Sequence, residues 1–135
     1  MFLQPKKIKY KKSYKGKYLK LNFQSNKLKF GTIGLKAAES GMISARQIEA
    51  ARQAINRKIK RKGKIWIRIF PSIPVTKKPT EARMGKGKGS LNYWGAKVRG
   101  GTILFELCGV TFNKALSAFH TGGAKLPIKT LIIKQ

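Results

Sequence analysis

The sequence predicts an α+β fold: a mixed or antiparallel sheet and two helices share one hydrophobic core, preceded by a basic N-terminal arm. The length of 135 residues and the 41% of apolar residues suit a single domain, residues 1–135. Two segments repeat apolar residues at spacings of three and four, which is typical of helices. Several short apolar segments are bounded by glycine or proline, which is typical of strands.

Residues 1–22 form the basic arm. Lysines crowd the stretch 4–20, where tyrosines recur every four residues at Tyr10, Tyr14 and Tyr18. A segment with so much like charge repels itself and becomes ordered when it meets a polyanion. The sequence leaves open whether the tyrosines stack on nucleic-acid bases or pack on the domain.

A first strand is expected over residues 27–37. Leu28 and Phe30 alternate with lysines there, as expected for a strand with one apolar face. Gly31 and Gly34 interrupt the pattern, and glycines within a strand often mark a bend. We therefore expect a strand with a glycine-marked bend.

The best-specified element is a helix that starts at the N-cap Ser44. Gln47, three residues later, completes a capping box, and Ile43 and Ile48 fit a hydrophobic staple. Gly63 is the expected C-terminal stop. One apolar stripe follows the helical spacing: Ile48, Ala51, Ile55 and Ile59.

The other face of this helix and the residues after it are cationic. Glu49 is the only acid there. The basic residues are Arg46, Arg52, Arg57, Lys58, Lys60, Arg61 and Lys62. The helix dipole favours cations near the C-terminus, but one or two would satisfy it, and a solvated face normally mixes signs. The pattern therefore favours contact with RNA over simple solvation.

A strand is expected over residues 64–70, where isoleucines face one way and Trp66, Arg68 and Phe70 face the other. Because both faces are largely apolar, the strand should be covered on both sides. Prolines then end regular structure and open a long glycine/lysine loop, residues 71–90. Loops of this length inside a compact domain are usually functional or disordered.

The remaining elements complete the domain. A strand over 92–98 should turn at residues 100–101, both glycine, into a hairpin with the strand 102–108. A short second helix should end at residues 122–123, and residues 125–134 should form a closing strand that pairs with an earlier one. Apolar residues at helical spacing mark the second helix: Phe112, Ala115, Leu116 and Phe119.

Net charge is the strongest functional signal. Thirty-one Lys and Arg residues stand against four Glu and no Asp, which gives a net charge of +27. A compact chain with that excess repels itself unless a dense polyanion neutralises it, so nucleic acid is the expected partner. The basic residues occur on several elements and no apolar run is long enough to span a bilayer, which argues against a membrane partner.

Enzyme chemistry has little support. His120 is the only histidine, and no Asp is available to orient it. Cys108 is the only cysteine, so no internal disulfide can form and a reducing compartment is permitted. One His and one Cys cannot hold zinc without the scattered glutamates. We expect no catalytic residue, metal or cofactor, a buried Cys108 thiol, and His120 at the surface or a helix end. The first ten residues lack the features of a secretory signal, so we expect the chain to start as it functions.

The stretch "RMGKGKGSLNYW", residues 83–94, alternates glycine with lysine. Its spacing fits neither a P-loop nor a dinucleotide fingerprint, and a strand rather than a helix should follow. In the RNA interpretation the glycines allow close backbone approach and the lysines supply charge. Arg83 then offers a planar fork and Met84 an adaptable apolar contact. A flexible loop without contacts is the alternative.

Three runs carry a resemblance to a known family. They are "ARQIEAARQAINRKIKRKGKIWIRIFP" (45–71), "KPTEARMGKGKGSLNYW" (78–94) and "AKLPIKT" (124–130). In this order and spacing they resemble the bacterial-type large-subunit ribosomal protein sixteen, the universal L-sixteen family. The N-terminal "LQPKKIKYKK" is also similar to that family's start. The resemblance covers nearly the whole chain and implies the family's two-helix α+β domain with a hammerhead-like sheet.

The resemblance also implies a structural, non-enzymatic component of the large ribosomal subunit beside the peptidyl-transferase region. The implied partners are large-subunit ribosomal RNA, transfer RNA and neighbouring ribosomal proteins, with no membrane span and no homo-oligomer. Family members bind ribosomal RNA with the arm and the basic helix, which correspond here to Lys6, Lys7, Lys9, Lys11, Lys12, Arg46, Arg52, Arg57, Lys58 and Arg61. The family's loop reaches toward A- and P-site transfer RNA and corresponds to Arg83, Met84, Gly85, Lys86, Gly87 and Lys88. In some bacterial members the matching arginine is hydroxylated, so Arg83 is a candidate for that modification.

Composition adds an expectation about origin. The chain has 24 Lys against 7 Arg and is rich in isoleucine, as expected from an AT-rich coding genome. We expect an organelle-encoded member in the mitochondrial ribosome of the matrix, with a plastid or the bacterial cytoplasm as alternatives. The run "KPTEARMG" resembles mitochondrial members more than plastid ones. A free-standing RNA chaperone is the alternative function from a different class.

Overall fold

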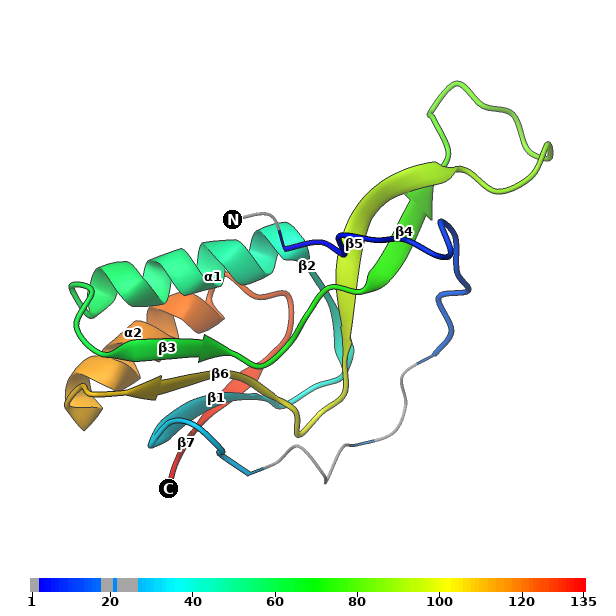
Figure 1. The fold of residues 1–135 in the computed structure, drawn as a ribbon. Helices are drawn as coiled ribbons and strands as arrows, with labels where there is room; N and C mark the ends of the chain where they lie inside the picture. The colour runs from blue at the N-terminus through cyan, green and yellow to red at the C-terminus, as the bar shows by residue number, and fades with distance from the viewer. Residues whose placement is uncertain (1–2, 18–20, 22–26) are drawn as a thin grey trace.

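The computed structural model describes residues 3–17, 21 and 27–135, in which two helices and seven strands form (Figure 1). In chain order they are β1 (Ile33–Ala37), β2 (Gly41–Ser44), α1 (Ala45–Lys58), β3 (Lys64–Ile67), β4 (Ile73–Lys77), β5 (Ser90–Val98), β6 (Ile103–Cys108), α2 (Phe112–Gly123) and β7 (Thr130–Lys134). The strands form an antiparallel four-stranded sheet in the order β3-β6-β1-β7 and an antiparallel three-stranded sheet in the order β2-β5-β4. The predicted α+β class is confirmed, with the strands divided between two sheets.

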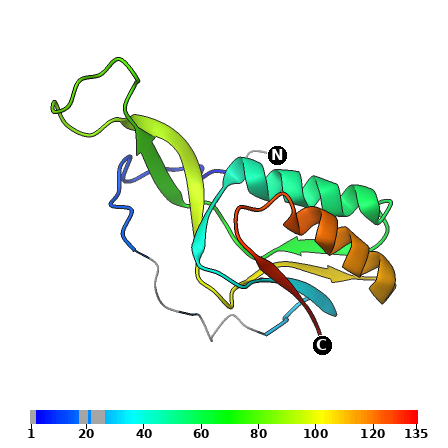
Figure 2. The same cartoon turned by 180° about the vertical axis from the view of Figure 1, so that it is seen from behind.

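Both helices cover the same face of the four-stranded sheet, as Figures 1 and 2 show from opposite sides. The residues between them are apolar, and Ile48, Phe105 and Phe119 are fully buried. The two helices approach closely because Gly122 has no side chain, since a Cβ atom there would lie 2.5 Å from Ile55 Cγ1. The ribbon formed by β4 and β5 extends away from this body and ends in a loop (Figure 1).

The start of α1 follows the sequence prediction. The Ser44 hydroxyl accepts a hydrogen bond from the Gln47 N–H at 3.3 Å, and the Gln47 side chain accepts one from the Ser44 N–H at 2.9 Å. The predicted stripe is confirmed because all four of its residues are buried. The predicted stop at Gly63 is wrong. The helix ends at Lys58, because Lys60 and Arg61 already adopt left-handed backbone angles, with φ of 54° and 60°.

Two other expectations about connections are wrong. The expected loop 71–90 contains the strand β4, in which Pro74 is tolerated because β4 lies at the edge of its sheet. The turn at Gly100 and Gly101 does not close a hairpin, because β5 pairs with β2 and β4 whereas β6 pairs with β1 and β3. This turn passes the chain from one sheet to the other. The second helix and the closing strand, which pairs with β1, are confirmed.

The strand expected over 27–37 begins only at Ile33, because the backbone before it is bonded to a buried carboxylate. Glu106 in β6 is 0% exposed. Its carboxylate accepts hydrogen bonds from four groups: the N–H of Lys29 at 3.1 Å, of Phe30 at 2.7 Å and of Gly31 at 2.7 Å, and the guanidinium of Arg68. Backbone donors committed to a side chain cannot also join a strand ladder. We call this arrangement the Glu106 anchor.

The Glu106 anchor holds a charged group inside the fold. Burial alone would raise the pKa of the Glu106 carboxyl, because it penalises the charged form. The hydrogen bonds from Gly31, Phe30 and Arg68 favour the carboxylate and outweigh burial, so the pKa lies below its ordinary value. The carboxylate therefore stays ionised at neutral pH and fixes residues 29–31 on the core.

The strand β3 is shorter than the expected 64–70 and lies at the edge of its sheet. Its apolar residues are only half-buried, so the expectation that it is covered on both sides is wrong. On its outer side the ring of Trp66 stacks on Phe30, with 6.1 Å between centroids. The Lys64 ammonium lies 5.2 Å from the centroid of the Trp66 ring. Phe30, which is itself 57% exposed, packs where a covering layer was expected.

Candidate nucleic-acid interface

The loop 78–89 stands at the far end of the β4–β5 ribbon (Figure 1). Residues 81–88 are exposed, and Met84 is 97% exposed. Gly85, Lys86 and Gly87 all have positive φ angles, of 95°, 52° and 80°. A Cβ atom at either glycine would meet no atom within 4 Å, so glycine is required there by the left-handed backbone and not by crowding. The side chains of the tip are therefore accessible to a partner.

The base of this loop is held by contacts of two kinds. A Cβ atom on Gly89 would lie 2.4 Å from the carbonyl oxygen of Lys77, so only glycine lets the two ends of the loop come this close. Within the loop, the Lys78 ammonium donates a hydrogen bond to the carbonyl of Gly85 at 2.6 Å. The loop therefore has a defined shape although its side chains face solvent.

The arm meets the loop at its base. The Lys12 ammonium donates a hydrogen bond to the carbonyl of Lys88 at 2.8 Å, and the Lys88 ammonium donates one to the carbonyl of Ser13 at 2.6 Å. These residues are about 75 positions apart in the chain. The structure thus brings together two segments that were predicted as separate RNA-binding regions. Lys12 and Lys88 reach protein carbonyls, so an RNA phosphate would have to share or replace these bonds.

The described part of the arm contains neither a helix nor a strand, and it lies along the β4–β5 ribbon (Figure 1). Ile8, Tyr10 and Ser13 line a shallow hollow together with Pro74 and Trp94. The predicted lysines of the arm are all exposed: Lys6, Lys7, Lys9, Lys11 and Lys12. Tyr10 and Tyr14 are 70% and 91% exposed, so their rings are mainly in solvent. Tyr18 lies outside the described residues.

The basic face of α1 is exposed along most of its length. Arg46, Arg57, Lys58 and Arg61 are exposed, together with Lys60 and Lys62. They lie on α1 and on the turn that follows it, as the helical periodicity predicts.

Arg52 differs from the other cations of α1, because it is bound within the helix. Its guanidinium donates two hydrogen bonds to the Glu49 carboxylate, at 2.6 and 3.0 Å. The hydrogen bond from Arg52 lowers the pKa of the Glu49 carboxyl and outweighs the opposing effect of burial. The same bond raises the pKa of Arg52. A phosphate at Arg52 would therefore compete with Glu49, a constraint that the sequence pattern did not show.

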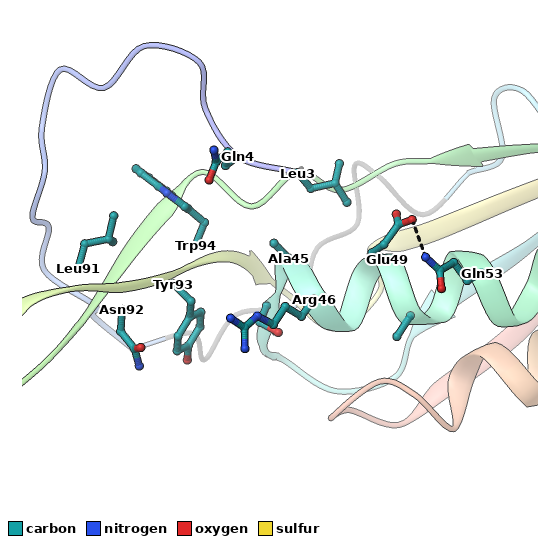
Figure 3. Close-up of a pocket in the computed structure, with 12 residues that line it drawn as sticks. Leu3, Gln4, Ala45, Arg46, Glu49, Gln53, Leu91, Asn92, Tyr93 and Trp94 are labelled. Carbon is teal, nitrogen blue, oxygen red and sulfur yellow. Dashed lines mark hydrogen bonds between the residues drawn. The ribbon is translucent and has the colours of Figure 1, made fainter. Parts of the chain in front are cut away.

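A groove of about 580 Å³ opens between the first turns of α1, residues 91–94 of β5 and residues 3–4 of the arm (Figure 3). Tyr93 is 38% exposed in its wall, whereas Trp94 is 8% exposed. Arg46 is the predicted RNA-binding residue that lines it.

The described residues contain no cluster of side chains suited to holding a metal ion. In residues 3–17, 21 and 27–135, no three His, Cys or Glu side chains come together as potential ligands. His120 is exposed in the last turn of α2, which confirms its predicted place at a helix end. Cys108 is half-buried at the last residue of β6, so the expectation of a buried thiol is wrong. Neither helix of the described part has the length and apolar character needed to cross a membrane.

Comparison with known proteins adds a separate line of evidence. Residues 5–133 match the family model described as ribosomal protein L16p/L10e. The chain is 54% identical over 133 residues to the large ribosomal subunit protein uL16 of Bartonella henselae, which covers 98% of this chain and 97% of that protein. It is 55% identical over 133 residues to the protein of the same name from Erythrobacter litoralis, covering 98% of this chain and 92% of that protein. It is 55% identical over 128 residues to that of Dichelobacter nodosus, covering 95% and 93%.

Proposed function

The chain belongs to the ribosomal protein L16p/L10e family, and from this premise we propose that it is a structural constituent of the large ribosomal subunit. It is a ribosomal protein and not an enzyme. It binds large-subunit ribosomal RNA beside the peptidyl-transferase region through the arm and the basic face of α1. Its loop 78–89 contacts transfer RNA in the A and P sites, and neighbouring ribosomal proteins complete its surroundings.

The observation that carries this proposal is the separation of two cationic surfaces. The basic end of α1 lies at one end of the body, whereas the loop tip lies beyond the other end of the ribbon (Figure 1). A single RNA helix would not need two such distant contacts, but a ribosomal RNA on one side and a transfer RNA on the other would. The exposed glycines and cations of the loop suit an RNA whose shape and phosphates matter more than its base sequence.

Composition supports a finer proposal about origin. We propose that the protein belongs to the mitochondrial ribosome, because its 24 Lys and 7 Arg suit an AT-rich coding genome and its run "KPTEARMG" resembles mitochondrial members more than plastid ones. The three relatives described above are bacterial proteins. Cell fractionation with an antibody against this chain distinguishes the matrix from a plastid or a bacterial cytoplasm.

Sedimentation tests the proposed function directly. In a gradient of cell extract at moderate salt, the protein should migrate with large ribosomal subunits at about one copy per subunit. A free-standing RNA chaperone, the alternative function, would leave most of the protein in lighter fractions. Migration away from the subunits would therefore refute the structural role.

Replacing Arg83 and Lys86 with alanine should weaken transfer-RNA binding without preventing assembly. Both side chains are exposed, and the loop that carries them lies away from α1 (Figure 1). The affinity of reconstituted subunits for transfer RNA should fall severalfold, and its dependence on log salt should flatten by about two units if each cation meets one phosphate. Filter binding at several salt concentrations measures both quantities.

The matched control removes two exposed cations elsewhere, Lys114 and Lys125, in and just after α2. It should leave transfer-RNA affinity close to that of the unmodified protein. If the Arg83 and Lys86 substitutions instead abolish incorporation into subunits, the loop is an assembly element and its proposed contact with transfer RNA is wrong.

A further inference from the structure

The groove beside α1 owes its shape to an irregularity in β5. Val75 pairs with Tyr93 and Thr76 with Leu91, so Asn92 is an extra residue opposite β4. A bulge of this kind changes the direction in which the following side chains point. In Figure 3, Asn92 and Tyr93 project to one side of the strand, whereas Leu91 and Trp94 project to the other. As a consequence, Tyr93 points toward α1, where Arg46 faces it.

The lining of the groove combines three kinds of group. Tyr93 presents an aromatic ring that is 38% exposed, and Arg46 presents an exposed guanidinium across from it (Figure 3). Gln4 and Asn92 add side-chain amides, which can both donate and accept hydrogen bonds. A ring, a cation and amides are the groups that bind the face, the phosphate and the edge of an unpaired base.

The only carboxylate of the lining does not oppose a phosphate strongly. Glu49 is bound by Arg52 on both oxygens and also accepts a hydrogen bond from Gln53 at 3.1 Å. Its charge is therefore compensated within the helix. The volume of about 580 Å³ lies in the usual range for small-ligand sites, roughly 300–1,000 Å³, and it is too small for a stacked duplex.

We propose that this groove holds a single unpaired nucleotide of large-subunit ribosomal RNA, with its base stacked on Tyr93 and its phosphate at Arg46. The proposal rests on the proposed function above, because it names the RNA element that this surface recognises. The net charge of +27 favours a nucleotide over an apolar protein side chain as the occupant. Gln4, on the arm, also lines the groove, beside Trp94 on the other side of β5 from Tyr93 (Figure 3).

Substitution of Tyr93 tests the stack. With the full chain and large-subunit ribosomal RNA as the probe, Tyr93→Ala should reduce affinity roughly 5- to 150-fold, the range for losing one base–aromatic stack. Tyr93→Phe keeps the ring and should stay within about twofold of the unmodified protein. Because Tyr93 is uncharged, the salt dependence of binding should not change, whereas Arg46→Gln should flatten it by about one unit.

The matched control is Leu131→Ala, which removes a large apolar side chain of 54% exposure from β7, at the edge of the four-stranded sheet opposite β3. It should not change RNA affinity. Thermal unfolding of each variant, followed by circular dichroism, shows whether a loss of affinity reflects a loss of folding. If Tyr93→Ala does not fold, the proposal is tested with Arg46→Gln instead. An unchanged salt dependence of RNA binding in Arg46→Gln would then contradict a phosphate at Arg46.

Chemical probing of the RNA identifies the occupant. One nucleotide should be protected at its base in the unmodified and Tyr93→Phe complexes, and it should become reactive with Tyr93→Ala. If Tyr93→Ala binds and protects RNA as the unmodified protein does, the groove holds no base and the inference is wrong. If the unmodified protein itself fails to bind this RNA, the proposed function fails instead, so the two failures are distinguishable.

Discussion

Glu106→Gln should lower the free energy of unfolding by about 3–5 kcal/mol, the cost of leaving a buried charge without its partner. Glu106 is 0% exposed, and the side chain of Arg68 beside it is 15% exposed. The neutral amide also loses acceptor strength toward the N–H groups of residues 29–31. Urea unfolding of the two proteins, compared at the same salt concentration, measures the difference.

Two further variants make this prediction specific. Glu39→Gln removes an exposed carboxylate that pairs with Lys129 at 3.2 Å, and it should cost less than about 1 kcal/mol. Glu106→Gln combined with Arg68→Met should cost less than Glu106→Gln alone, because it leaves no unpaired charge while the glutamine oxygen still accepts hydrogen bonds from the N–H groups of residues 29–31. Equal stabilities of Glu106→Gln and the unmodified protein would show that the Glu106 anchor contributes nothing.

The same anchor predicts a loss of stability in acid. The pKa of Glu106 is lower in the folded protein than its ordinary value of 4.5, so its carboxylate binds fewer protons when folded. Its contribution is present above pH 4.5 and is lost as the pH falls through the folded value. As the pH is lowered from 4.5, the thermal unfolding midpoint of the unmodified protein should decrease more steeply than that of Glu106→Gln. Thermal unfolding followed by circular dichroism at several pH values measures this difference.

The second large effect concerns RNA affinity. If the chain meets six or more phosphates, its affinity for ribosomal RNA should fall about a thousandfold or more between 50 and 200 mM salt. Replacing Arg57, Lys58 and Arg61 with glutamine should flatten the plot of log affinity against log salt by roughly two to three units, about 0.7–0.9 per phosphate. Equilibrium binding to large-subunit ribosomal RNA measures both.

Arg52 provides the contrast within the same helix. Because it is already bound to Glu49, Arg52→Gln should change the salt slope less than Arg57→Gln does. A flat salt response of the unmodified protein would refute the basic face of α1 as an RNA-binding surface. Equal slopes for the two single variants would show that RNA displaces Glu49 from Arg52.

Local signals in the sequence predicted both helices and the start of α1, whereas they could not predict which strands pair. Ser44 and Gln47 bond to each other within one turn, so a short motif was enough to place the start of α1. The glycines at 100–101 predict a turn, but which sheet the next strand joins depends on residues far away in the sequence. β4 was missed because Pro74 usually ends a strand, and only the edge position allows it.

For the candidate interface, too, the sequence predicted the local features but not the contacts between distant segments. Charge and periodicity identified the basic face of α1 and the cationic loop, but they gave no sign that Lys88 would meet Ser13. The buried Glu106 had one signal, a lone acid within the apolar run "TILFELC", and its partners at 29–31 came from a segment that was predicted as strand. Likewise, the direction of Tyr93 depends on a bulge that the sequence pattern does not contain.

The edges of the two sheets bear on the life of this protein before assembly. β3 and β7 lie at the edges of one sheet, and β4 at an edge of the other, where unpaired backbone groups could recruit a second copy. Lys64, Lys77 and Lys134 stand on these strands, and Pro74 removes one backbone donor from β4. Like charge and a missing donor both oppose edge-to-edge aggregation. The edge lysines and the edge proline thus oppose self-association of copies that have not yet joined a particle.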